Sequence, residues 1–345
     1  MAPIGIALIG GGLFAQQAHM PAIMSEDNLA LKAIYSRSLK SAQATAALNS
    51  RSGTTPDLYS EDSGSSRTFK DLLARDDISA VIVALPIPSQ PQYVEAALAA
   101  GKHVLAEKPI APTVEVASKL IEFSRGLGPG NKATLAIAEN FRFKPSFAYA
   151  AAQAAALGRL HHFSVRVLYY MSAGSQWYGT AWRARPEFQG GFLLDGGVHF
   201  AAAARQLLTD SAAETAAFTA QVQPHLPPID SVSAVVRLQS GVSGTYQQSC
   251  GSDLDTSVFQ FGYEKGSVVV DGDKVTVTRD GKDEVKEFER TSGVTEEVAA
   301  WAKALAEGKE DKRQSADEAL ADLEFLELMF ESGLGNGEAK KYEHQ

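Results

Sequence analysis

Short apolar runs alternate with longer amphipathic segments over the first 140 residues of the chain. Apolar and β-branched runs predict buried strands at 3–9, 29–35, 78–85, 103–106 and 133–138. Helices are predicted between them, at 14–24, 39–49, 69–74, 93–100 and 114–126, with a polar loop at 54–66. Strands that alternate with helices in this way indicate a doubly wound parallel sheet.

The pattern changes after about residue 140. Helices are predicted at 145–157 and around Asp195, with a strand at 163–170 between them. Strands without intervening helices follow, at 217–222, 231–238, 244–249, 258–263, 267–271 and 275–279. This pattern favours a large, mostly antiparallel open sheet. Two helices come next, at 294–307 and 315–330, and the Gly-, Glu- and Lys-rich tail from Gly333 is expected to fray.

At 345 residues the chain is long enough for two domains. We place them at 1–140 and 141–345, with the last helices packing back toward the first domain.

The net charge of −9 argues against a general nucleic-acid or membrane binder, because both need a basic surface. Cys250 is the only cysteine, so an intramolecular disulfide is impossible. Neither a long apolar span nor a signal-peptide pattern is present, and a cytoplasmic protein is expected.

A glycine-rich segment directly follows the first predicted strand and opens a helix: Gly10-Gly11-Gly12-Leu13-Phe14-Ala15. It fits the pattern G-x-G-x-x-A, in which the first glycine allows a tight turn and the second lets the backbone approach a pyrophosphate. The helix N-terminus that follows favours the anion. Glycine clusters also form ordinary turns, but the strand and helix on either side favour a Rossmann domain. We predict cofactor contacts from Gly10, Gly12, Leu13, Phe14 and Ala15.

The end of the second predicted strand distinguishes the two nicotinamide dinucleotides. NAD-binding proteins usually carry an acidic residue there for the ribose 2′-hydroxyl, whereas this chain has Ser36 followed by Arg37. A hydroxyl beside a guanidinium suits a 2′-phosphate, which the guanidinium can pair with or stack beside. The sequence therefore predicts NADP(H) in preference to NAD(H). The alternative is that Arg37 is a solvated loop charge.

Asp195 and His199 are four residues apart in a predicted helix, so they would share one face of it. A carboxylate and an imidazole side by side can transfer a proton near neutral pH. Gly196 and Gly197 carry no Cβ atom, and we expect a flat ligand to approach the backbone there. Asp195 could instead be only a helix N-cap, and a lone histidine is more often structural than catalytic.

Glu107-Lys108-Pro109 follows the fourth predicted strand and adds a third motif. Over nearly the whole chain, the three motifs together resemble the Gfo/Idh/MocA family of oxidoreductases. The segments 138–143, 182–186 and 190–195 are most similar to a fungal or yeast NADP-dependent branch. The resemblance implies cofactor contacts from Leu85, Pro86, Gln90, Glu107, Lys108 and Asn140. Leu85 departs from the family, because many members have threonine before this proline.

The resemblance also implies catalytic roles for Lys108, Asp195 and His199. As an ammonium, Lys108 would stabilise an alkoxide on the substrate. His199 would take the proton, directly or with Lys108 as a relay, and Asp195 would orient the histidine or the substrate. A cis peptide bond between Lys108 and Pro109 is also suggested.

Trp182 and Arg183 precede the Asp195 helix. They could bind a polyhydroxylated substrate or the cofactor, or they could serve only packing and surface charge. No metal site is expected, since the adjacent His161 and His162 would point to opposite faces of a strand.

The expected function is NADP-dependent hydride transfer to or from a sugar, polyol, sugar lactone or related small carbonyl compound. A cofactor-binding sensor of the same fold without turnover is the alternative, and a reductase of a diketone or pyrrole is a third possibility. The complete set of Lys108, Asp195 and His199 favours an enzyme. Members of the family pair through the open sheet, so a homodimer or homotetramer is expected.

Overall fold

The computed structural model describes residues 2–49 and 55–345, so Thr54, the first residue of the predicted polar loop, lies outside the described residues. The chain divides into two compact units. The first comprises Met1–Asn140 with Val294–Ala319, and the second comprises Phe141–Gly293 with Leu320–Gln345. Residues 294–319 therefore pack with the first unit, although they follow the strands of the second in sequence.

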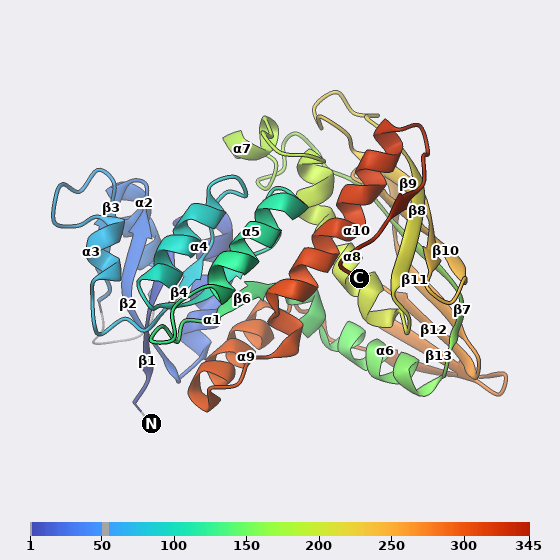
Figure 1. The fold of residues 1–345 in the computed structure, drawn as a ribbon, viewed down its shortest axis with the longest axis horizontal. Helices are drawn as coiled ribbons and strands as arrows, with labels where there is room; N and C mark the ends of the chain where they lie inside the picture. The colour runs from blue at the N-terminus through green and yellow to red at the C-terminus, as the bar shows by residue number, and fades with distance from the viewer. Residues whose placement is uncertain (1, 50–54) are drawn as a thin grey trace. The chain divides into compact units, whose positions relative to one another are not determined.

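The first unit is built around six parallel strands in the order β3-β2-β1-β4-β5-β6. They are β1 (Ile4–Ile9), β2 (Leu29–Ser36), β3 (Asp57–Ser60), β4 (Ala80–Val83), β5 (His103–Glu107) and β6 (Leu135–Ala138) (Figure 1). The order reverses between β1 and β4, which confirms the predicted doubly wound sheet. The loop prediction at 54–66 is wrong at β3, because only Leu58 and Tyr59 give this short edge strand an apolar pattern.

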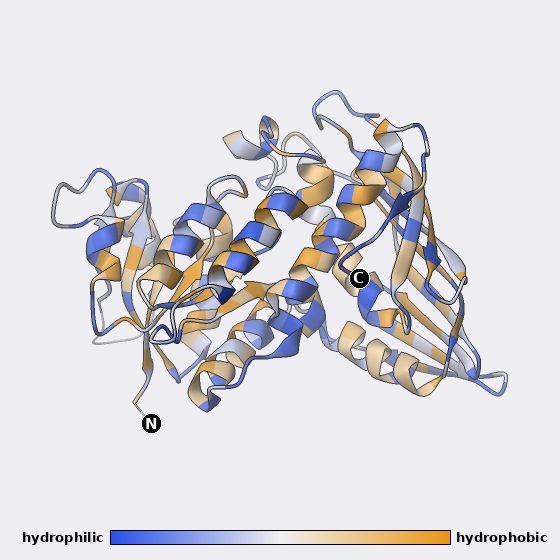
Figure 2. Cartoon of the chain, in the orientation of Figure 1, coloured by the Kyte–Doolittle hydropathy of each residue, from blue (hydrophilic) through white to orange (hydrophobic). Residues whose placement is uncertain are grey.

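The strands of this sheet are apolar because both of its faces are covered. All four residues of β4 and residues 5–9 of β1 are buried, and Figure 2 shows these strands in the orange of hydrophobic residues. The covering helices are η1 (Ala15–His19), α1 (Met20–Ser25), α2 (Leu39–Ala46), α3 (Phe69–Leu73), α4 (Gln90–Ala99), α5 (Val114–Arg125) and α9 (Val294–Glu307). Ser38, Thr68 and Thr113 begin α2, α3 and α5, since each side chain accepts a bond from the backbone N–H three residues on.

The second unit contains a nine-stranded sheet in the order β14-β13-β12-β11-β7-β10-β9-β8-β15. Its strands are β7 (Leu160–Tyr170), β8 (Ala212–Ala220), β9 (Ser231–Leu238), β10 (Ser243–Ser249), β11 (Gly251–Tyr263), β12 (Gly266–Asp271), β13 (Lys274–Arg279), β14 (Lys282–Glu287) and β15 (Lys340–Lys341). Only the β10–β7 pair is parallel among these strands, which confirms the predicted mostly antiparallel sheet. The sequence does not predict β14 or β15, because β14 is exposed throughout and β15 has two residues.

Helices lie on one face of the nine-stranded sheet. They are α6 (Pro145–Ala156), α8 (Gly191–Leu207) and α10 (Ala316–Leu334) (Figure 1). Buried and exposed residues alternate along β9, as they do where one face of a sheet is packed and the other is open. No helix in the described part of the chain is long and apolar enough to cross a membrane.

The tail after Gly333 is held in place, contrary to the fraying expected from its composition. Tyr342 stacks on Phe325, with ring centroids 5.6 Å apart, and β15 pairs with β8. The carboxylate of Glu324 accepts bonds of 2.6 and 3.0 Å from the backbone N–H groups of Glu343 and His344. Composition reports local preference only, whereas these tertiary contacts fix the segment.

Candidate active site

The glycine-rich segment lies at the carboxyl end of β1, where the strand order reverses. Gly10 has a φ of 128°, and a Cβ atom there would lie 2.2 Å from the carbonyl oxygen of Ala84. Gly12, in contrast, has no described atom within 4 Å of the place its Cβ would occupy. The turn therefore requires Gly10, whereas Gly12 leaves the backbone open to a ligand. Such an open cradle fits the pyrophosphate of a dinucleotide.

The other predicted cofactor residues of the first unit follow neighbouring parallel strands or the glycine turn. Leu13 and Phe14 are half-buried, and Ala15 is buried where η1 begins. Most of the remaining residues stand at strand ends: Ser36 at the end of β2, Leu85 and Pro86 after β4, Glu107 and Lys108 at the end of β5, and Asn140 after β6. Gln90 instead opens α4. Carboxyl ends of parallel strands share one edge of a sheet, which is where open α/β sheets bind ligands.

Ser36 and Arg37 differ in exposure. Ser36 is buried, whereas Arg37 is exposed just beyond the strand. Asp62, which follows β3, accepts a 2.7 Å bond from the backbone N–H of Leu39 and a 2.6 Å bond from the hydroxyl of Ser60. These bonds lower the pKa of the Asp62 carboxyl. Asp62 therefore orders the loop after β2 as an ionised acceptor.

Tyr35, Tyr93 and Glu61 form a network that the sequence does not predict. Glu61 accepts bonds of 3.2 and 3.1 Å from the hydroxyls of Tyr35 and Tyr93. Burial, and after it the Tyr93 hydroxyl and the Glu61 charge, raises the pKa of Tyr35, so this hydroxyl stays protonated. These residues belong to three separate segments, and no spacing in the sequence links them.

The lysine motif leaves β5 through a cis peptide bond between Lys108 and Pro109, as the resemblance suggests. The amide Nε2 of Gln90 donates to the carbonyl oxygens of Glu107 and Pro109, at 2.5 and 3.3 Å. The Glu107 carboxylate meets His19, with 2.6 Å between Oε1 and the imidazole Nε2. Sequence reasoning missed His19, because it lies 88 residues from Glu107 and belongs to no spacing motif.

The predicted acid–base pair lies within α8, with Asp195 and His199 one helical turn apart. The N-cap of this helix is Gly190, in the left-handed conformation, so the N-cap interpretation of Asp195 is wrong. Oδ2 of the buried Asp195 carboxylate lies 2.6 Å from Nε of Arg183. The Arg183 guanidinium stacks over Trp182, 4.2 Å from the ring centroid. The structure thus brings three of the predicted substrate-site residues of this unit together.

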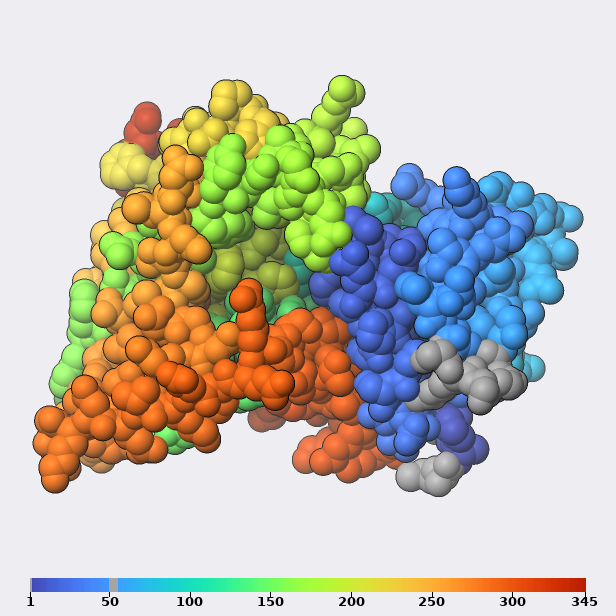
Figure 3. Space-filling view, turned by 180° about the vertical axis from the view of Figure 1, so that it is seen from behind, coloured from blue at the N-terminus to red at the C-terminus, as the bar shows by residue number. Residues whose placement is uncertain are grey.

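Trp182 and Arg183 belong to the short helix α7 (Ala181–Ala184). It lies in the loop 171–190, which reaches the surface, in yellow-green in Figure 3.

His199 is held by an aromatic contact. Its half-buried imidazole stacks on the ring of Phe141, with centroids 4.8 Å apart and planes 14° from parallel. Stacking fixes the plane of the imidazole while leaving its nitrogens at the ring edge for hydrogen bonds. Phe141 belongs to the segment 138–143 of the resemblance, but the sequence shows no role for it. Its contact with His199 joins two segments that are far apart in the chain.

The two glycines of α8 serve the packing of the protein itself, so the expectation of a ligand there is wrong. A Cβ on Gly197 would lie 2.2 Å from the amide nitrogen of Gln248, and one on Gly196 would lie 2.9 Å from the hydroxyl of Tyr169. Burial, with the neighbouring charges of Cys250 and Asp195, raises the pKa of Tyr169 well above its usual range. The sequence shows that two Cβ atoms are missing, but not what fills their place.

Comparison with known proteins agrees with both halves of this arrangement. Residues 4–128 match a family described as "Oxidoreductase family, NAD-binding Rossmann fold", and residues 147–276 match the Gfo/Idh/MocA C-terminal domain. The chain is 37% identical to dehydrogenase FPY6 of Fusarium mangiferae over 98% of each protein. The chain belongs to the Gfo/Idh/MocA oxidoreductase family.

Two further proteins extend the comparison. The 1,5-anhydro-D-fructose reductase of Ensifer adhaerens is 30% identical over 59% of this chain and 60% of that protein. The crystal structure of an oxidoreductase from Thermotoga maritima matches with a TM-score of 0.85 and 27% identity, over 98% of each chain. The first unit is therefore an NAD(P)-binding Rossmann domain, and the resemblance inferred from the sequence is confirmed.

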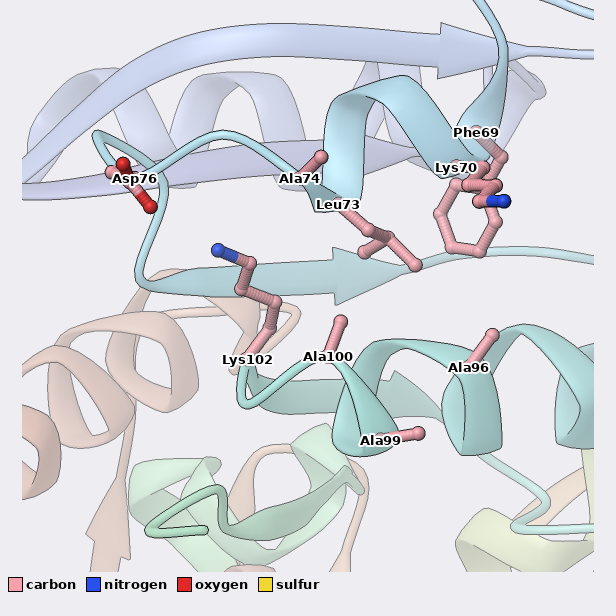
Figure 4. A pocket seen from close by; sticks show the side chains of 9 residues that line it. All are labelled: Phe69, Lys70, Leu73, Ala74, Asp76, Ala96, Ala99, Ala100 and Lys102. Carbon is pink, nitrogen blue, oxygen red and sulfur yellow. The ribbon is translucent and has the colours of Figure 1, made fainter. Parts of the chain in front are cut away.

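This Gfo/Idh/MocA oxidoreductase also has a hollow of about 640 Å³ between α3 and α4 (Figure 4). Lys102 lines it, but its ammonium donates to the carbonyl oxygens of Arg75 and Ile78 at 2.7 and 2.8 Å. Burial lowers the pKa of Lys102, and its hydrogen bonds serve the backbone.

Within residues 2–49 and 55–345, no group of three or more His, Cys, Asp or Glu side chains could hold a metal ion.

Proposed function

We propose that this chain is an NADP(H)-dependent oxidoreductase that transfers a hydride to or from a sugar, polyol or related small hydroxy or carbonyl compound. The acid–base face of α8 carries the proposal. There Asp195 is anchored by Arg183 at 2.6 Å, and His199 is held on Phe141. An oxidoreductase that acts on an alcohol needs such a proton-transfer group in addition to its cofactor.

The cradle at Gly10 and Gly12, with Lys108 at the same sheet edge, would hold the cofactor, which accepts or supplies the hydride when bound. In the oxidative direction, the C–H bond of the substrate carbinol breaks and its electron pair leaves as hydride. The hydroxyl proton passes to His199, and the carbonyl forms. The ammonium of Lys108 stabilises the developing oxyanion, and the anchored Asp195 orients the substrate or the imidazole. Carbonyl reduction reverses these steps.

The preference for NADP(H) rests on Ser36 and Arg37, since no carboxylate stands at the end of β2. The exposed guanidinium of Arg37 would pair with the 2′-phosphate. Competition calorimetry with NADP and NAD tests this point on the full chain. We expect tighter binding of NADP, and a preference for NAD would contradict the assignment.

A polyhydroxylated substrate is supported by the Trp182–Arg183 stack beside Asp195, which offers a flat apolar face next to charged hydrogen-bonding groups. The test is cofactor reduction by the purified chain across a panel of aldoses, polyols and their lactones. Turnover with NADP that is lost in His199→Ala supports the enzyme. Tight NADP binding without turnover, unchanged in that variant, would indicate a sensor instead.

We also propose that the chain forms a homodimer or homotetramer through the exposed face of the nine-stranded sheet. Phe218 on β8 and Val235 on β9 lie on this face, and they are 67% and 52% exposed. Large apolar side chains at such exposure are typical of a surface that another chain covers.

A further inference from the structure

A buried side-chain pair joins the glycine-rich end of the first unit to the segment that carries Lys108. His19 has no exposed surface, and its Nε2 lies 2.6 Å from Oε1 of Glu107, which is 9% exposed. A carboxylate only accepts hydrogen bonds, so the imidazole is the donor. The bond therefore ties the turn after β1 to the end of β5.

His19 reaches Glu107 because the helix after the glycine segment opens with a π-helical turn. In η1 the backbone N–H of Met20 bonds to the carbonyl oxygen of Ala15, five residues earlier. One residue corresponds to about 100° around a helix axis, so a regular α-helical turn would direct position 19 elsewhere. Turns of this kind are rare and occur frequently at functional sites.

Gln90, at the start of α4, holds the same segment through its backbone. This side chain is 1% exposed, and its Nε2 donates to the carbonyl oxygens of Glu107 and Pro109, at 2.5 and 3.3 Å. These two residues are the immediate neighbours of Lys108. One amide group therefore fixes the backbone on both sides of the lysine. His19 in turn holds the side chain of Glu107, the residue before the lysine.

Fold stability does not explain these groups. Nδ1 of His19 and Oε1 of Gln90 are buried without a hydrogen-bond partner in the described part of the chain. A buried polar atom without a partner destabilises the fold. Apolar side chains of similar volume often fill such a space at no loss of stability. His19 and Gln90 instead share one feature, which is that each bonds to an immediate neighbour of Lys108.

We infer that His19 and Gln90 are positioning residues that set the place of the Lys108 ammonium, an inference that rests on the proposed role of Lys108 in stabilising the reacting oxygen. His19 engages the Glu107 carboxylate, which would otherwise be free to pair with the neighbouring ammonium and neutralise it. Gln90 prevents the backbone of Lys108 from shifting. A displacement of the reacting groups by about 1 Å can lower a rate by about 100-fold.

Competitive acetylation of the full-length protein with acetic anhydride tests the inference without a substrate. Mass spectrometry follows the labelling of Lys108 as a function of pH, relative to Lys119, whose side chain is 67% exposed. His19→Leu removes the donor, whereas His19→Gln keeps an N–H close to the position of Nε2. We expect the pH dependence of Lys108 labelling to change in His19→Leu and to return to that of the wild type in His19→Gln. The labelling of Lys119 should be unchanged in both variants.

A His19→Leu profile identical to that of the wild type would overturn the inference, as would an altered profile that His19→Gln does not restore. If His19→Leu does not fold, Gln90→Met decides in the same assay, because it keeps the side-chain length and lacks the donor. There an altered Lys108 profile with an unchanged Lys119 supports the inference, and a wild-type profile overturns it.

A kinetic arm separates this inference from the proposed function. With a substrate found in the panel, we expect kcat to fall by about 100-fold in His19→Leu, with the KM for NADP nearly unchanged. Full turnover by Lys108→Ala would refute the proposed role of Lys108. Loss of turnover in Lys108→Ala, with wild-type labelling in His19→Leu, would leave that role intact and refute the positioning.

Discussion

The two units carry their chemistry in different ways. In the first, the strands are buried on both faces, and the candidate cofactor residues stand in turns at the carboxyl edge of a parallel sheet. In the second, helices lie on one face of the sheet, and the candidate acid–base groups project from one of them, α8. The first arrangement relies on an open backbone, and the second relies on side chains held by neighbours.

This difference explains why one site is easier to recognise in sequence than the other. An open backbone needs glycine at fixed spacing after a strand, which the segment 10–15 shows directly. A side chain held in place needs partners from elsewhere in the chain. Arg183 and Phe141, which hold Asp195 and His199, are 12 and 58 residues away from them in sequence.

The largest expected effect comes from removing the proton-transfer group of the second unit. We expect His199→Ala to lower kcat by about 10²–10⁴-fold, because general acid–base catalysis contributes that much. NADP binding should be unchanged, since His199 is not among the predicted cofactor residues. His161→Ala, at an exposed position on β7, is the matched control and should retain activity. Equal activity of the two variants would contradict the account.

Removing Arg37 tests the side-chain contribution of the first unit. We expect Arg37→Ala to weaken NADP binding by roughly 10- to 100-fold, the effect of losing a charge-assisted bond of about 1.5–3 kcal/mol. NAD binding should be unaffected, because it has no 2′-phosphate. Lys32→Ala, which removes an exposed cation within β2, serves as the control in calorimetry. Equal losses for NADP and NAD would show that Arg37 does not read the 2′-phosphate.

A pair of glycine substitutions sharpens the comparison of backbone and side-chain sites. In Gly12→Ala the new Cβ meets no described atom, so we expect an unchanged melting temperature and NADP binding weaker by about tenfold, or roughly 1.4 kcal/mol. In Gly197→Ala it displaces Gln248, which bonds to the Leu193 carbonyl and the Tyr246 hydroxyl. We expect that variant to lose about 1–3 kcal/mol of unfolding free energy. Calorimetric melting and NADP titration compare the two variants. A lower melting temperature in Gly12→Ala, or an unchanged one in Gly197→Ala, would contradict this expectation.

The smallest expected effect on activity concerns the exposed face of the nine-stranded sheet. Phe218→Asp should convert the proposed oligomer to a smaller species in light scattering, because it places a charge in an apolar contact. The unfolding free energy of the isolated chain should change by no more than about 0.5 kcal/mol, since the side chain is largely exposed. An unchanged molar mass above that of the monomer would place the interface elsewhere.

Much of the fold follows from the sequence, because long apolar runs and helix periods survive in the structure. The exceptions are elements without such a pattern: the edge strand β3, the polar β14 and the tail held by Glu324 and Tyr342. In the candidate site, spacing places Asp195 and His199 on one helix face. It cannot reveal that Gln248 and Tyr169 fill the space above the α8 glycines, since only tertiary packing brings them there.

We propose that Lys108 and His199 both serve the hydride transfer. A double-mutant cycle of Lys108→Ala and His199→Ala, measured as kcat/KM with a substrate found in the panel, tests it most directly. Groups that act as a unit are strongly non-additive, so we expect the double variant to be little worse than the poorer single variant. Losses that multiply, or a single variant with full activity, would contradict the account.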